Sequence, residues 1–411
     1  MKQLHRRVVV TGLGILSPIG NTVSEAWSSC TEGISGITSV DVGISNSPVS
    51  IGAQLKNFNT SDYLDPKEVR RIDPFIQYGL IAANQSIADS GILDLPSLNK
   101  EKVGMNFGAG IGGIQTIENN KVILESKGHK KVSPFFVPGS IVNMISGLVS
   151  IKHGFMGPNT SVVTACSTGN HCIGTAARSI ACGEADVMIA GGAEMASTPL
   201  SISGFISARA LSTNSDPELA CRPWDKDRDG FILADGAGSL VLEDYEHAKQ
   251  RNAHIYAEII GFGMSSDAYH MTAPPEDGRG AALSMKNALI DAELNHEEID
   301  YINAHGTSTP LGDLAETRAL KTIFTNSMPS ISSTKSMTGH TLGAAGAIES
   351  IFCIKSLNDN VVPPTINLIN QDPECDLDYT PLKSIDKKVS VAMNNSFGFG
   401  GTNSTLVFKK I

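Results

Sequence analysis

The sequence predicts an α/β fold built from two related halves. Short runs of β-branched and apolar residues alternate with helix-like segments along all 411 residues, which is the pattern of α/β domains. A weak internal repeat is the second observation, because Thr168-Gly-Asn-His-Cys-Ile-Gly-Thr-Ala-Ala177 is echoed by Thr338-Gly-His-Thr-Leu-Gly-Ala-Ala345. Each copy follows a predicted strand and opens a helix with small side chains. The hydrophobic content of 41% suits one large unit made of two halves.

Nine segments are predicted strands, since each is short, apolar or β-branched, and followed by turn residues or a helix-like segment. They are Arg7–Thr11, Val103–Phe107, Ser161–Thr164, Val187–Ala190, Ser239–Leu242, Ile255–Gly261, Tyr301–Ala304, Ser330–Ser333 and Ser390–Asn394. No low-complexity linker separates the halves. The polar and charged segment Asp244–Arg251 is the best boundary, which predicts domains at residues 1–250 and 251–411.

Composition excludes several classes of protein. The net charge of −10 argues against general nucleic-acid binding. Seven scattered cysteines without a C-x-x-C pair predict a reducing compartment, the cytoplasm, and no metal site. No run of 18 apolar residues occurs, so no membrane span is expected. The low charged fraction of 18% and the 40 glycines favour extensive buried surface, including a subunit interface.

The first stretch with chemical potential surrounds Cys166. A predicted strand, Ser161–Thr164, runs into the small residues Ala165–Gly169, and a small-sided helix is expected from Ile173 onward. Cys166 would then lie beside the free N–H groups of a buried helix, which stabilise a thiolate or an oxyanion. Two interpretations fit this stretch alone: a nucleophilic cysteine, or one more small buried hydrophobic residue.

Three further loops follow predicted strands and carry polar residues. His305 lies in Asn303-Ala-His-Gly-Thr-Ser-Thr309, Lys335 and His340 lie in Lys335-Ser-Met-Thr-Gly-His340, and a glycine-rich turn surrounds Phe399. A lone histidine after a strand is usually structural. Four such loops with Cys, Lys and two His predict a shared active site.

The motifs T-A-C-S-T-G, N-A-H-G-T-S-T-P-L-G-D, K-S-M-T-G-H-T-L-G-A-A-G and N-S-F-G-F-G-G-T-N resemble those of the β-ketoacyl-[acyl-carrier-protein] synthases. The resemblance covers nearly the whole chain and is closest to the elongating type II enzymes, partly through Ser265–His270. It implies a thiolase fold, with two duplicated βαβαβ-type halves forming a layered αβαβα core. Cys166 belongs to the N-terminal half, and the histidine and lysine loops belong to the C-terminal half. Asp235 stands where the family usually has Glu.

The resemblance implies a decarboxylative Claisen condensation in fatty-acid elongation without a cofactor or a metal. Cys166 would carry the acyl group, His305 and His340 would stabilise the enolate, and Lys335 would add positive potential, paired with Glu349. Backbone N–H groups of Cys166 and Phe399 would form the oxyanion hole. Thr307 and Thr309 would bind the pantetheine arm, Phe399 would gate the acyl tunnel, and Ile111 would line it. The implied substrate-binding residues are Thr307, Thr309, Ile111, Phe397 and Glu349.

The implied partners are acyl- and malonyl-loaded acyl carrier protein and a second copy of the chain, with no nucleic acid and no membrane. Acyl carrier protein is acidic, so an acidic enzyme needs a local basic patch to bind it. The candidates for this patch are Lys67, Arg70, Arg71 and Arg209, with Lys127, Lys130 and Lys131 as further candidates.

Three alternative functions share parts of this pattern. A thiolase would need a second cysteine in a C-terminal C-x-G loop, where this chain has Phe397-Gly-Phe399-Gly. A non-catalytic partner subunit would lack the active cysteine, and Cys166 is present. A ketosynthase of a polyketide pathway would use the same residues, so this alternative stays open.

Overall fold

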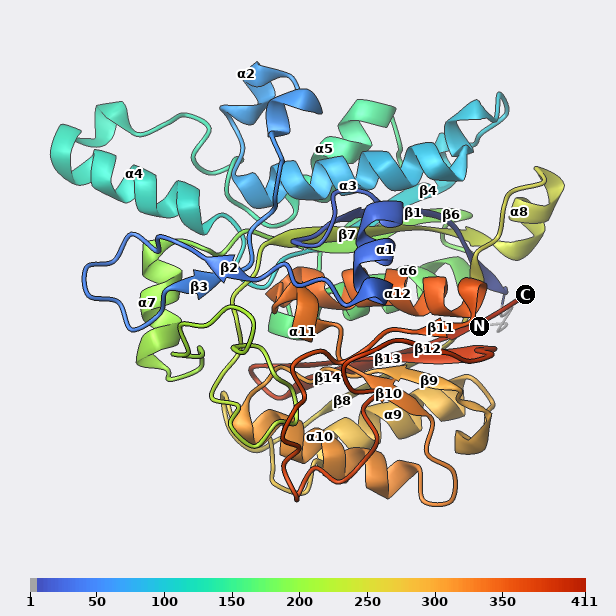
Figure 1. Ribbon diagram of the computed structural model, residues 1–411. Coiled ribbons are helices and arrows are strands. Elements are labelled where there is room, and N and C mark those ends of the chain that lie inside the picture. Colours follow the sequence, from blue (N-terminus) through green and yellow to red (C-terminus); the bar gives the residue numbers. More distant parts are fainter. Residues whose placement is uncertain (1–5) are drawn as a thin grey trace.

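The computed structural model describes residues 6–411 and has five layers (Figure 1). Helices α3 (Pro74–Ser90) and α5 (Met144–His153) cover one outer face, and α9 (Arg279–Asp291) and α10 (Pro310–Ile323) cover the other. Two layers of strands lie inside them. Between the strand layers are α6 (Thr168–Ala181) and α12 (Ala345–Asp359).

The two strand layers repeat one topology. The first contains β1 (Val8–Leu16), β4 (Val103–Gly108), β5 (Asn159–Thr160), β6 (Val187–Glu194) and β7 (Gly236–Asp244), in the spatial order β5-β4-β6-β7-β1. The second contains β8 (Ala257–Ser266), β9 (Tyr301–Asn303), β10 (Ser330–Ser332), β13 (Val391–Gly398) and β14 (Thr402–Lys409), in the order β10-β9-β13-β14-β8.

Equivalent strands also pair with the same polarity. The second, third and fourth strands of each half are parallel, and the fifth pairs antiparallel with the fourth and the first. The layers join where Val8–Val10 of β1 pairs with Ala257–Ile259 of β8. This duplication confirms the predicted α/β fold of two halves. The boundary at residues 250 and 251 stays a prediction; helix α8 (Tyr245–Gln250) lies there.

The remaining elements surround this core. The helices are α1 (Val23–Glu32), α2 (Pro66–Val69), α4 (Ile114–Lys127), α7 (Pro199–Ser207) and α11 (Lys335–Thr338). Two small sheets pair β2 (Thr38–Ser39) with β3 (Ile51–Gly52) and β11 (Val361–Val362) with β12 (Ile385–Asp386). Among residues 6–411, no helix combines the length and the apolar character needed to cross a membrane.

The central helices α6 and α12 pack closely because both carry small residues. A Cβ at Gly346 would lie 2.6 Å from Asn170 Oδ1, and one at Gly174 would lie 2.4 Å from the Phe262 ring. Both distances are too short for an added carbon. The predicted small-sided helix at 168–181 is therefore buried against its counterpart and against the second sheet.

Two strand predictions differ from the structure. Ser161–Thr164 is not a strand; the chain pairs with β4 only at Asn159–Thr160, at the edge of the sheet. Val163 is 54% exposed, so the apolar run does not mark a buried strand there. The strand β14 was not predicted, because its first half, Thr402-Asn-Ser-Thr405, is polar although it is largely buried.

The register predicted for the internal repeat is also wrong. Helix α6 follows a 3-10 turn at Ala165–Ser167, and α12 follows a 3-10 turn at Leu342–Ala344. Both turns open on a left-handed residue, Ala165 with φ 49° and Leu342 with φ 46°. Thr168 therefore corresponds to Ala345, the first residue of α12, and not to Thr338.

Candidate active site

Cys166 lies in the middle of the 3-10 turn that leads into α6. The neighbouring Ala165 has φ 49°, a conformation that is costly for a residue with a Cβ and is concentrated at functional sites. Side chains hold the turn in place: Thr168 Oγ1 donates to Ala165 O at 2.8 Å, and Ser167 Oγ donates to Ser396 O and Thr402 O, both at 2.8 Å. The turn of one half is thus fastened to the strands of the other.

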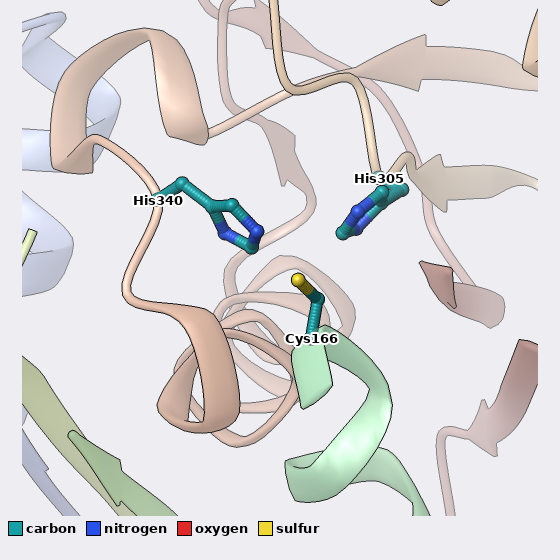
Figure 2. A group of neighbouring side chains, drawn as sticks. All are labelled: Cys166, His305 and His340. Carbon is teal, nitrogen blue, oxygen red and sulfur yellow. The ribbon is translucent and has the colours of Figure 1, made fainter. Parts of the chain in front are cut away.

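Two histidines from the C-terminal half face the Cys166 thiol (Figure 2). His305 follows β9, and His340 lies between α11 and the turn before α12. Their ring centroids are 5.3 Å apart at an interplanar angle of 85°. The sulfur and one nitrogen of each ring lie within 4.8 Å of one another. The structure therefore brings together three residues that are far apart in sequence.

The same trio is the group within residues 6–411 that offers three neighbouring ligand atoms to a metal ion. Thiolate and imidazole suit zinc and other transition metals. A thiol beside two imidazoles can also support covalent catalysis without a metal.

The trio lies in a cavity of about 640 Å³. Most of the predicted substrate-binding residues contribute to its wall. The predicted residues that line it are Ile111, Cys166, Arg209, His305, Thr307, Thr309, His340, Phe397 and Phe399. Thr307 Oγ1 lies 3.0 Å from Thr309 Oγ1, so two hydroxyls mark one side of the cavity. Phe205, Phe231 and Leu342, which cluster with Cys166, make another side apolar.

Lys335 and Glu349 form a buried ion pair outside this cavity lining. The two side chains are 1% and 2% exposed, and Lys335 Nζ donates to Glu349 Oε1. Burial raises the pKa of Glu349 to about 7, and the lysine opposes this effect. The predicted pairing is confirmed. The expectation that Glu349 contacts substrate is not supported by this placement, since Glu349 is absent from the cavity wall.

Burial shifts the pKa values of all three groups of the trio towards their neutral forms. Burial raises the pKa of Cys166 to about 12, although Lys335 and the backbone N–H groups of Phe399 and Cys166 lower it. The pKa values of His305 and His340 are held well below the ordinary range by burial, with a further contribution from Lys335. The expectation of a stabilised thiolate stays a prediction: burial opposes the charged form of Cys166, and Lys335 and the backbone N–H groups favour it.

Sequence reasoning missed the carboxylate that holds the His305 loop. Glu316 of α10 accepts hydrogen bonds from His305 N at 2.9 Å and Gly306 N at 2.7 Å. Gly306 has φ 22°, and a Cβ there would lie 2.8 Å from the Trp224 ring, so glycine is required. The sequence does contain an indication of this role, because Glu316 lies one helix turn after Asp313 in the helix that follows the His305 loop.

A second buried carboxylate was also missed. Glu194 ends β6, and its oxygens accept hydrogen bonds from four backbone N–H groups, those of Gly110, Ile111, Gly112 and Gly343. Its signal was an acidic residue closing an otherwise apolar, glycine-rich strand.

The predicted docking residues occupy two places. Arg209 is exposed and lies on the cavity wall. Lys67 of α2, Arg70 and Arg71 are exposed and do not line the cavity. The Arg71 guanidinium lies 4.7 Å from the centroid of the Phe135 ring. Their role in docking stays a prediction.

The chain matches two family models over most of its length. These are "Beta-ketoacyl synthase, N-terminal domain", over residues 5–248, and "Beta-ketoacyl synthase, C-terminal domain", over residues 256–369. Curated relatives include proteins named 3-oxoacyl-[acyl-carrier-protein] synthase 2. Those of Coxiella burnetii and Vibrio cholerae are 53% identical to this chain, and that of Staphylococcus aureus strain COL is 48% identical. Each comparison covers 99% of both chains.

Solved structures show the same fold. A beta-ketoacyl synthase from Burkholderia phymatum superposes with a TM-score of 0.91 at 35% identity, covering 99% of this chain and all of the other. A type II polyketide ketosynthase, solved in complex with its acyl carrier protein, gives a TM-score of 0.91 at 34% identity and covers 99% of both chains. These neighbours confirm the predicted thiolase-type fold.

Proposed function

Because this chain belongs to the beta-ketoacyl synthase family, we propose that it condenses malonyl-[acyl-carrier protein] with an acyl group held on Cys166. The product is 3-oxoacyl-[acyl-carrier protein], and the enzyme is an acyltransferase of fatty-acid elongation. The observation that carries this proposal is the convergence of Cys166, His305 and His340 in one cavity.

The first half-reaction is acyl transfer to Cys166. Its sulfur attacks the thioester carbonyl of the acyl carrier, the new C–S bond forms, and the bond to the pantetheine sulfur breaks. The thiol proton leaves through a neighbouring neutral imidazole and reaches the departing pantetheine thiolate. The backbone N–H groups of Cys166 and Phe399 stabilise the oxyanion; their lowering of the Cys166 pKa supports this role.

The second half-reaction is decarboxylation and condensation. Malonyl thioester loses CO2, and the electron pair of the broken bond becomes an enolate whose oxygen accepts hydrogen bonds from His305 and His340. Neutral imidazoles donate one N–H each, which suits this role. The enolate carbon attacks the acyl group, the bond to Cys166 breaks, and the released thiolate takes up one proton from solvent.

The similarity favours fatty-acid elongation over a polyketide pathway. The curated relatives named 3-oxoacyl-[acyl-carrier-protein] synthase 2 are 48–53% identical to this chain, whereas the polyketide ketosynthase is 34% identical. The two classes use the same reacting groups, so the degree of similarity is what separates them.

Intact-mass analysis tests the proposal. Incubation with acyl carrier protein should add one acyl group per chain, and addition of malonyl carrier protein should remove it with formation of the 3-oxoacyl product. Cys166→Ala should fold and form no adduct. An adduct on Cys172 or Cys182 instead would contradict the assignment.

Acyl carrier protein is the proposed partner, supported by the polyketide ketosynthase solved with its own carrier protein. The exposed Lys67, Arg70 and Arg71 and the cavity-lining Arg209 are the proposed contacts. Reversing the first three charges should raise KM for the carrier substrate, and salt should weaken the effect because the Debye length is about 10 Å at 0.1 M. Lys286→Glu, on the exposed surface of α9 in the opposite outer layer, is the control.

A symmetric homodimer acting in the cytoplasm completes the proposal. Support comes from the edge strand β5, which has a single neighbouring strand and is flanked by the exposed Met156 and Val163. Open apolar sheet edges are normally covered by another chain or element. Sedimentation at micromolar concentration should give twice the 43.4 kDa mass of the chain; a monomer would contradict this part.

A further inference from the structure

The fully buried carboxylate of Glu194 joins two segments that meet at the active site. Its Oε2 lies 2.5 Å from Gly110 N and 3.1 Å from Gly343 N, and its Oε1 lies 3.1 Å from both Ile111 N and Gly112 N. One segment connects β4 with α4 and carries Ile111. The other is the 3-10 turn before α12, which carries Leu342 and lies just beyond His340.

No residue with a side chain would fit in the centre of this contact. A Cβ at Gly343 would lie 2.3 Å from Gly110 N, and one at Gly110 would lie 2.7 Å from Glu194 Oε2. Both positions therefore need glycine for the backbone N–H groups to converge. All four donors point at the carboxylate, and their hydrogen bonds oppose the rise in the Glu194 pKa that burial causes.

The two joined segments supply part of the apolar wall of the cavity. Ile111 and Leu342 both line it, and Leu342 clusters with Phe231 and Cys166. The hydroxyls of Thr307 and Thr309 mark the polar side. On the proposed function, an acyl chain held on Cys166 lies against the apolar wall, and the carrier arm lies along the polar one.

We propose that Glu194 is a positioning residue that sets the selectivity for acyl chain length, because it fixes Ile111 and Leu342 relative to Cys166. The inference rests on the proposed function. It assigns to Glu194 no contact with substrate and no proton transfer. Glu194 affects how well the apolar wall accepts a long acyl chain. Because the wall is closely packed, a small displacement of Ile111 or Leu342 would make the more distant carbons of the acyl chain fit poorly.

Glu194→Gln tests this role. The amide keeps the size of the side chain but replaces one acceptor oxygen with an NH2 group that faces backbone N–H donors, so the two segments should separate. The measurement is the rate of acyl-enzyme formation by intact mass, with short-chain and long-chain acyl carrier proteins. We expect the ratio of the long-chain to the short-chain rate to fall about tenfold, while short-chain acylation continues.

Glu118→Gln is the matched control. The Glu118 carboxylate on α4 also accepts a backbone hydrogen bond, from Leu200 N at 3.0 Å, and one from Thr198 Oγ1 at 2.6 Å. Glu118 does not line the cavity. The same substitution there should leave the rate ratio unchanged, which separates a specific effect from general loosening.

A ratio equal to that of the wild type in folded Glu194→Gln would overturn the proposal. If that variant does not fold, Glu194→Asp replaces it, because Asp keeps the charge but is too short to reach all four N–H groups, and the same ratio decides. Loss of all acylation in the wild-type protein would instead contradict the proposed function, so the two failures are distinguishable.

Discussion

The 3-10 turns before α6 and α12 occupy equivalent places in the two halves, yet they contribute different groups to the candidate site. Each begins at a left-handed residue, Ala165 or Leu342, and each leads into a central helix. The first turn exposes the Cys166 side chain to the cavity, whereas the second has Gly343 at the equivalent position. Gly343 contributes a backbone N–H to Glu194.

This difference shows how a duplicated unit becomes an asymmetric active site. One turn carries Cys166, the proposed nucleophile, and the other carries Leu342 of the apolar wall and follows His340. The second turn packs directly against the segment that carries Gly110, because neither Gly343 nor Gly110 has a Cβ. The following experiments test this division of labour.

The largest effect is expected at the histidines. Because the remaining imidazole can still carry the thiol proton, His305→Ala and His340→Ala should each still acylate Cys166. Each should lose about 10²–10³ in malonyl decarboxylation, the usual cost of one oxyanion donor. Adduct formation by intact mass and CO2 release are measured on each variant. Decarboxylation at the wild-type rate would remove that histidine from the proposed role.

A smaller effect is expected when a side chain is added to the second turn. In Gly343→Ala the new Cβ would lie 2.3 Å from Gly110 N and 2.7 Å from Ala109 C, so backbone atoms must move. Overpacking of this kind costs about 1–3 kcal/mol in the free energy of unfolding. Denaturant titration measures the change.

Gly204→Ala is the control for that substitution. Gly204 lies in α7, and a Cβ there meets nothing within 4 Å. The alanine variant should be as stable as the wild type or more stable, by up to about 1 kcal/mol, because alanine favours helix. Equal stability of Gly343→Ala and Gly204→Ala would show that the second turn tolerates a side chain as the first does.

A pH-dependent effect is expected in the segment that supports His340. Residues 232–234 bond to the His340 backbone, and Asp235, which follows them, accepts hydrogen bonds from Ala196 N and Ser197 N. Burial raises the pKa of Asp235 to about 7. The folded state therefore holds a proton that the unfolded state has already released, so this group's contribution to stability falls as pH rises from about 4 to 7.

Asp235→Asn removes that titration while keeping an acceptor oxygen. The unfolding free energy of the variant relative to the wild type should increase between pH 4 and pH 7, by a few kcal/mol at most, and then level off. Thermal or denaturant unfolding at several pH values measures it. A difference that does not vary with pH would show that Asp235 is ionised throughout this range.

The sequence by itself determined the fold class and pointed to the candidate reacting groups. Alternating strands and helices, with a repeated small-sided helix, are enough to predict two α/β halves. Cys166, His305, Lys335 and His340 stand in short motifs that single them out as candidates without coordinates. The prediction that Lys335 pairs with Glu349 depends on the resemblance to a known family, and the buried ion pair confirms it.

Only the tertiary structure decided how these parts act together. The pKa of the Cys166 thiol depends on burial, which no local motif reports. The register of the repeat depends on which residue begins each central helix. The similar sequences that start at Thr168 and Thr338 predict the wrong register, because α12 begins at Ala345. Only the structure shows that Glu194 and Glu316 hold loops in place, because both accept hydrogen bonds from backbone N–H groups. The Gly343 N–H that binds Glu194 is distant in sequence, and the Gly306 N–H that binds Glu316 lies in a loop of unusual conformation. The sequence gives the identity of each side chain, but these contacts depend on the path of the backbone, which brings N–H groups of distant loops to one carboxylate.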